Sequence, residues 1–211
     1  RVNNRDRKRC GELLRRLQVE VANEEDRGRV ATALDEMSKL DDYIMLWEVA
    51  GPFSQAGVDA DGLFEVEFGP EPRDRKKRIR WQFLDTRERG GRAWEADLAK
   101  GLGDSTTCVG YLKTRIWVRD EMAVRLEMGS DDAVKAWLNG ELVHANNVAR
   151  PVRAGDDQAD VLLRKGWNEL LLKVVQRGGN WGACARFRTL DNCSVPGLRA
   201  EVGRCTQEFG Q

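Results

Sequence analysis

The sequence predicts a mainly β protein, an antiparallel β-sandwich preceded by a helical hairpin. Residues 1–43 carry apolar side chains at three- and four-residue steps, which is the period of an amphipathic helix. From residue 44 onward the pattern changes to short segments of strand character. Turn signals separate these segments, and no helix-length segment lies between them. This spacing is typical of an antiparallel sandwich or barrel and argues against a fold of alternating strands and helices.

The helical segment divides into two amphipathic stripes. The first stripe consists of Leu13, Leu14, Leu17 and Val21, and the second of Val30, Ala33, Leu34, Met37 and Leu40. Asn23, followed by acidic residues, suits a helix start because its side chain caps backbone N–H groups and negative charge is favourable there. A lone hairpin buries little, so we expect its apolar stripe to face the rest of the chain or a neighbouring domain. It is also a candidate for the end of a helical repeat.

Strands are expected in order along the rest of the chain. Their predicted ranges are 44–50, 63–68, 79–83, 94–98, 108–118, 122–128, 134–138, 141–144, 159–163, 169–175 and 181–188. Residues 169–175 are apolar on both faces, as expected for a central strand. The predicted domains are therefore a helical hairpin (1–43), a β-sandwich (44–190) and an irregular C-terminal tail (191–211).

The stretch from Gly129 to His144 is the first candidate for a ligand site. Ser130, Asp131 and Asp132 predict an acidic turn between two strands. The second strand places Trp137 on the face opposite its alternating apolar residues. Asn139-Gly140 predicts a two-residue hairpin, because a type I′ turn requires positive φ at both central positions.

Composition restricts the partners. The chain has 211 residues, of which 41% are hydrophobic and 33% charged, and Lys+Arg and Asp+Glu are both 35. A formal net charge of zero argues against a large basic surface for nucleic acid. No apolar run is long enough to span a bilayer and no signal-type segment is present, so no membrane partner is expected. The chain begins with Arg1 rather than Met, which suits a fragment or a processed product.

The five cysteines do not form a C-x-x-C pair, so no zinc site is predicted. Cys108 and Cys184 lie in apolar strands and are expected to be small buried side chains. Cys193 and Cys205 flank a tail with Gly and Pro and are candidates for a disulfide, which leaves the redox compartment open.

Three stretches resemble the galactose-binding-like jelly roll. They are residues 47–53 (WEVAGPF), 129–132 (GSDD) with 137–140 (WLNG), and 163–174 (LRKGWNELLLKV). Over about residues 44–190 the chain is similar to the carbohydrate-binding modules attached to bacterial glycoside-processing proteins. The resemblance implies a jelly roll that acts as a non-catalytic carbohydrate-binding module in a larger multidomain protein. It also implies an extracytoplasmic or secreted setting.

The resemblance extends to a possible metal. The acidic pair is similar to one in the sugar-binding module of the protective-antigen type, where the pair binds calcium that coordinates sugar hydroxyls. This implies Asp131 and Asp132 as calcium ligands, which suits a hard cation that prefers oxygen. The alternative is that either carboxylate caps the turn by accepting backbone N–H groups.

The candidate ligand-binding residues are aromatic platforms and polar loop residues. The platforms are Trp94, Trp137, Trp181 and Tyr111, because an aromatic face stacks on the C–H face of a pyranose. The polar candidates are Asp131, Asp132, Asn139, Asn146 and Asn147.

Two other function classes stay open. One is a structural or protein-interaction β-sandwich that packs against a neighbouring domain. The other is an enzyme, which requires His144 or two carboxylates in one pocket. No pattern in the sequence selects such a pair, and no catalytic residue is predicted.

Overall fold

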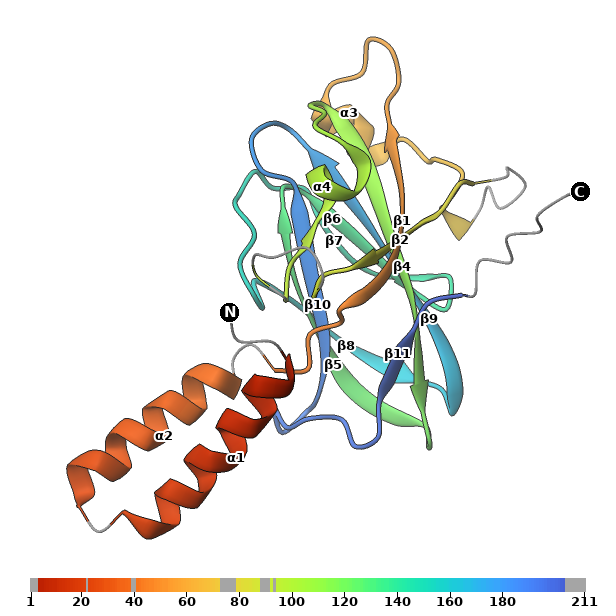
Figure 1. Cartoon of the computed structure of the whole chain (residues 1–211). Coiled ribbons are helices and arrows are strands. Elements are labelled where there is room, and N and C mark those ends of the chain that lie inside the picture. Colours follow the sequence, from red (N-terminus) through yellow and green to blue (C-terminus); the bar gives the residue numbers. More distant parts are fainter. Residues whose placement is uncertain are drawn as a thin grey trace, which may run out of the picture. The chain divides into compact units, whose positions relative to one another are not determined.

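The computed structural model describes residues 4–21, 23–38, 41–72, 79–87, 92 and 94–203 (Figure 1). The chain divides into two compact units, Arg1–Tyr43 and Ile44–Gln211. None of the helices in these ranges is long and apolar enough to cross a membrane.

The first unit is the expected pair of helices, α1 (Asn4–Glu20) and α2 (Glu24–Ser38), which run antiparallel in Figure 1. The start of α2 is confirmed at Asn23, whose Oδ1 accepts the Glu25 backbone N–H at 2.9 Å. Leu13 and Leu17 of the predicted apolar stripe are 52% and 44% exposed. The side chains of Leu34, Met37 and Leu40 lie outside the described residues.

The second unit is a β-sandwich, as predicted. Within the described ranges, seven strands form one sheet, in the order β2-β1-β4-β9-β6-β7 with β11 beside β4, and four strands form the other, β3-β10-β5-β8. The strands are β1 Leu46–Phe53, β2 Gln82–Asp85, β3 Ala96–Asp97, β4 Cys108–Val118, β5 Met122–Asp131, β6 Val134–Leu138, β7 Glu141–Asn146, β8 Asp157–Leu163, β9 Gly166–Gln176, β10 Gly182–Thr189 and β11 Arg199–Glu201. Neighbouring strands are antiparallel, for example β4 with β9 and β5 with β10.

The main core lies between the two sheets. Leu112 and Leu172 enter it from the larger sheet, and Leu126 and Phe187 from the smaller one. The alternation of β4 explains this arrangement, because every second side chain of a strand points to the same face. Cys108 and Cys184 are buried, as expected, whereas Cys205 lies outside the described residues.

A second apolar cluster covers the outer face of the larger sheet. It brings Leu63 and Phe64 of helix α3 (Ala60–Glu65) together with Tyr111 and Trp137. The prediction of a strand at 63–68 is therefore wrong. Asp59 caps the helix by accepting the Gly62 backbone N–H at 2.8 Å, and packing of the apolar pair on the sheet outweighs the alternating pattern.

Three smaller predictions also differ from the structure. β1 continues through Gly51 and Pro52 instead of ending before them. The segment at 94–98 provides only the two residues of β3, because Asp97 caps the short helix α4 (Leu98–Leu102). The tail, expected to be irregular, adds β11 to the edge of β4.

The predicted acidic turn is a crossover between sheets. β5 extends through Ser130 and Asp131 in the smaller sheet, and the chain enters the larger sheet just after Asp132. The hairpin at Asn139-Gly140 is confirmed, with φ of 53° and 84° at its two central residues.

Candidate functional site

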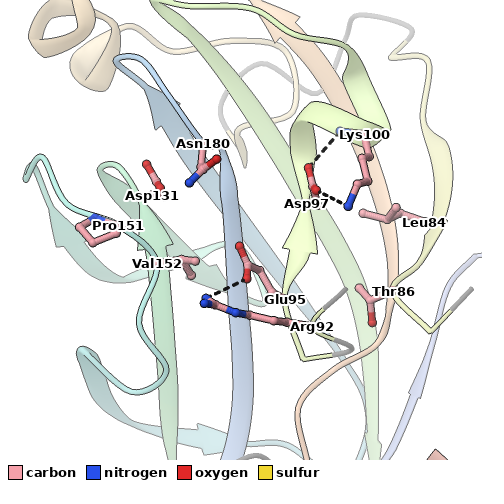
Figure 2. A pocket seen from close by; sticks show the side chains of 10 residues that line it. All are labelled: Leu84, Thr86, Arg92, Glu95, Asp97, Lys100, Asp131, Pro151, Val152 and Asn180. Carbon is pink, nitrogen blue, oxygen red and sulfur yellow. Dashed lines mark hydrogen bonds and ion pairs between the residues drawn. The ribbon is translucent and has the colours of Figure 1, made fainter. Parts of the chain in front are cut away.

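A pocket of about 360 Å³ lies beside the end of β5 (Figure 2). Its ionisable lining residues are Arg92, Glu95, Asp97, Lys100 and Asp131. The other lining residues are Leu84, Thr86, Pro151, Val152 and Asn180. Five separate segments of the sandwich supply these side chains, and the volume falls in the range of small-molecule sites. We call it the Asp131 pocket.

Asp131 is the most unusual group in this pocket. The residue is only 6% exposed, and its carboxylate receives a hydrogen bond from the Val152 backbone. No described Lys, Arg or His forms an ion pair with it. Burial, followed by the charges of Asp132 and Glu95, raises the pKa of Asp131 to about 6. A buried carboxylate that faces a pocket with a perturbed pKa marks a candidate functional site.

The other charged groups of the pocket are engaged to different degrees. Asp97 accepts the Lys100 backbone N–H at 3.0 Å, and its other oxygen lies 2.9 Å from the Lys100 ammonium. Arg92 lies 3.6 Å from Glu95. Burial nevertheless raises the pKa of Glu95, with Arg92 opposing the shift. Glu95 and Asp131 therefore offer strong acceptors to a ligand that supplies hydroxyl or ammonium donors.

Asp132 has a structural role. One of its oxygens accepts the Arg150 backbone N–H at 3.1 Å, and the other accepts the Arg177 backbone N–H at 2.8 Å. This matches the capping alternative. Among the residues with described positions, no group of three or more His, Cys, Asp or Glu is placed to hold a metal ion. The acidic pair therefore fits calcium poorly, because the ion takes six to eight oxygen ligands.

The three candidate asparagines lie in polar networks. Asn139 donates to Asn168 at 2.8 Å and accepts the Glu169 backbone N–H at 3.0 Å, which ties the hairpin to β9. Asn146 donates to Asp157 at 2.8 Å. Asn147 donates to Asp61 at 3.0 Å. None of the three lines the Asp131 pocket.

The candidate tryptophans are separated from one another. Trp137 is 7% exposed and lines a second pocket, of about 270 Å³, together with Glu65, Glu67 and Glu71. Trp181 is buried in the main core. Trp94 is partly exposed, with the Arg92 guanidinium 5.6 Å from its ring centre. The structure thus places the two leading candidates, Asp131 and Trp137, in different pockets.

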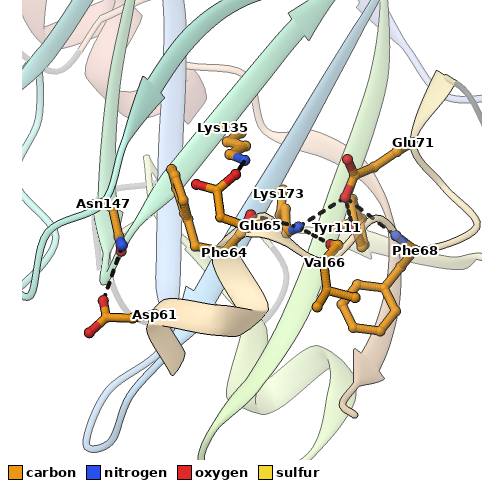
Figure 3. A network of polar contacts seen from close by, with 10 residues as sticks. All are labelled: Asp61, Phe64, Glu65, Val66, Phe68, Glu71, Tyr111, Lys135, Asn147 and Lys173. Carbon is orange, nitrogen blue, oxygen red and sulfur yellow. Dashed lines mark hydrogen bonds and ion pairs between the residues drawn. The ribbon is translucent and has the colours of Figure 1, made fainter. Parts of the chain in front are cut away.

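A buried polar network fixes the segment that follows α3 (Figure 3). The fully buried Lys173 donates to Glu71 at 2.9 Å and to the carbonyl of Val66 at 2.6 Å. Tyr111, also buried, donates to the same Glu71 oxygen at 2.6 Å. Burial lowers the pKa of Lys173, and Glu71 opposes that shift. Tyr111 is therefore a structural hydrogen-bond donor rather than an exposed platform.

His144 belongs to another network. Its Nε2 lies 3.0 Å from Asp157, which also accepts from Asn146 and pairs with Arg150. Burial alone raises the pKa of Asp157, but the hydrogen bonds from Arg150 and Asn146 outweigh it and hold the pKa below its usual value. His144 does not line the Asp131 pocket.

Sequence reasoning identified Asp131 but missed its neighbours in the pocket. Glu95 lies beside a two-residue strand and Asn180 in the turn before β10, and neither carries a local motif.

Comparisons with known proteins gave only distant structural similarities. No family model and no curated protein matches the chain. An anti-sigma factor domain-containing protein is 16% identical, with a TM-score of 0.40 over 58% of this chain and 40% of its own. A β-glucuronidase from Faecalibacterium prausnitzii is 16% identical, with a TM-score of 0.39 over 62% of this chain and 20% of its own. A β-glucosidase from Kluyveromyces marxianus is 9% identical, with a TM-score of 0.43 over 68% of this chain and 16% of its own.

The chain thus spans at most two fifths of the length of these three proteins. Because the similarity is this distant, function has to be argued from the residues of the site.

Proposed function

We propose that this chain is a non-catalytic carbohydrate-binding module and that the Asp131 pocket holds the sugar. The observation that carries the proposal is a buried carboxylate, with no ion-pair partner among the described residues, that faces a polar pocket (Figure 2). Sugar hydroxyls can donate hydrogen bonds to this carboxylate in addition to the one that it accepts from the Val152 backbone. Hydrogen bonds to charged groups contribute about 1.5–3 kcal/mol each, more than neutral ones.

The rest of the lining suits a monosaccharide unit. Glu95 adds a second acceptor, and the Asn180 amide both donates and accepts, as sugar hydroxyls do. Pro151 and Val152 supply apolar surface for the C–H groups of the ring. The mechanism is therefore polar recognition at the pocket, without stacking on Trp137.

Calcium is a separate question within this proposal. Both oxygens of Asp132 already accept backbone N–H groups, which leaves fewer of their lone pairs for a calcium ion. We expect binding that does not depend on calcium, and the experiment includes a chelator for that reason.

A glycan array followed by calorimetric titration tests the proposal. The double variant Glu95→Gln/Asn180→Ala removes one charged and one amide partner, and we expect it to weaken binding about tenfold or more. The control is Glu121→Gln, an exposed position between β4 and β5, which is expected to bind as the unmodified protein does. The proposal fails if folded protein binds no glycan with or without calcium, or if the double variant binds unchanged.

A further inference from the structure

The charge balance of the Asp131 pocket narrows its ligand class. Three carboxylates and two cations line the pocket. Lys100 forms an ion pair of 2.9 Å with Asp97, and Arg92 forms one of 3.6 Å with Glu95. Among the residues that the structure describes, none forms an ion pair with Asp131.

The cationic side chains near the crossover are directed elsewhere. The Arg150 guanidinium donates to the Ser130 hydroxyl at 2.9 Å and pairs with Asp157. The Arg177 guanidinium donates to Asp61 at 2.6 Å and to Asn147 at 2.8 Å. The backbone N–H groups of Arg150 and Arg177 do donate hydrogen bonds to the acidic pair, but both donate to Asp132. Within the part of the chain that the structure describes, no cationic side chain therefore serves as a counterion for the Asp131 carboxylate.

A carboxylate in this position is costly unless something neutralises it. A neutral sugar hydroxyl can donate a hydrogen bond to the Asp131 carboxylate but does not neutralise its charge. A protonated amine does both, because it brings three donors and a positive charge. A sugar acid would add a further negative charge beside the carboxylates of Glu95 and Asp131, which is repulsive at short range.

From this geometry we infer that the Asp131 pocket selects saccharides that carry a protonated amino group, prefers them to neutral sugars and rejects uronic acids. The inference rests on the proposed carbohydrate function and deepens it.

Calorimetric or NMR titration with four related sugars provides the test. Glucosamine carries the amine, N-acetylglucosamine keeps the substituent without charge, glucose lacks it, and glucuronic acid carries the opposite charge. Near neutral pH and at low salt we expect glucosamine to bind about tenfold or more tighter than glucose or N-acetylglucosamine. Glucuronic acid is expected to bind weakest.

Two perturbations assign that preference to Asp131. In Asp131→Asn the ratio of glucosamine to glucose affinity is expected to fall to about one, whereas Asp160→Asn, an exposed carboxylate on β8, is expected to keep it. Lowering the pH below about 6 protonates Asp131 and is expected to reduce the same ratio in the unmodified protein.

The outcomes separate the two claims. Equal binding of glucosamine and glucose, or a preference that survives Asp131→Asn, overturns the amino-sugar inference while the carbohydrate function stands. Absence of binding to all four sugars and to the glycan array overturns the proposed function itself.

Discussion

Replacement of Asp131 by Asn is expected to stabilise the fold near neutral pH. The carboxylate is 6% exposed and its pKa rises from 3.8 to about 6, chiefly because burial disfavours the charged form. A rise of about two units corresponds to about 3 kcal/mol of destabilisation by the ionised group. Asn has the same shape and still accepts the Val152 hydrogen bond, but it is itself a buried polar group, so we expect a gain of about 1–2 kcal/mol.

The sign of the pH dependence follows from the direction of the shift. Well below 3.8 the carboxyl group is protonated in both folded and unfolded chains, so it does not affect their balance. As the pH rises toward about 6, the unfolded chain ionises first, and stability falls until both forms are ionised. The advantage of the Asn variant should therefore grow over this interval and stay constant above it.

Urea unfolding of both proteins across this pH range measures the effect directly. The urea midpoints of the two proteins are compared at each pH. Equal slopes of unfolding free energy against urea concentration show that both proteins expose the same surface on unfolding. A variant that is less stable than the parent near neutral pH, or a gain that is the same at every pH, would refute the reasoning about Asp131.

Three further predictions concern the stability of the β-sandwich. Asp132→Asn is expected to destabilise the fold by about 1–3 kcal/mol, because an amide side chain cannot accept both backbone N–H groups. This effect is opposite in sign to that of Asp131→Asn, and equal urea midpoints for Asp132→Asn and the parent would contradict it. Lys173→Met is expected to lower the free energy of unfolding by about 3 kcal/mol, because it leaves the buried Glu71 carboxylate without its ion-pair partner. A double-mutant cycle with Glu71→Gln that shows no coupling energy would contradict this. Gly129→Ala is expected to cost about 3 kcal/mol or more, since an added Cβ would lie 1.8 Å from the Arg153 carbonyl oxygen; an unchanged melting temperature would exclude that clash.

The fold could be predicted from the sequence where the pattern is strong and local. β4 begins and ends at the predicted residues, because its alternating side chains meet the core on one face. The turn at Asn139-Gly140 follows from backbone preference alone. The strand prediction at 63–68 was wrong because the Asp59 cap and the packing of Phe64 on the larger sheet decide that segment, and the second of these is a tertiary contact.

The candidate site was harder to predict, because its residues meet only in space. Asp131 and Asp132 are adjacent and chemically identical in the sequence, yet one faces a pocket and the other binds two backbone N–H groups. Trp137 does lie on the face opposite the main core, as its alternation predicted, but the cluster around Phe64 covers that face. Glu95 joins Asp131 from a distant segment without any sequence signal.

An amide chemical-shift titration of the isotope-labelled protein with glucosamine tests the central claim most directly. A site with a Kd of about 1 mM is filled largely at about 10 mM sugar, so even weak binding is visible. We predict that the chemical-shift changes are concentrated at Glu95, Asp131, Val152 and Asn180. In Asp131→Asn we predict that these changes no longer reach saturation at the same glucosamine concentration. Shifts confined to the surroundings of Trp137 and Gly140, or no shifts at all, would contradict the assignment of the Asp131 pocket as the ligand site.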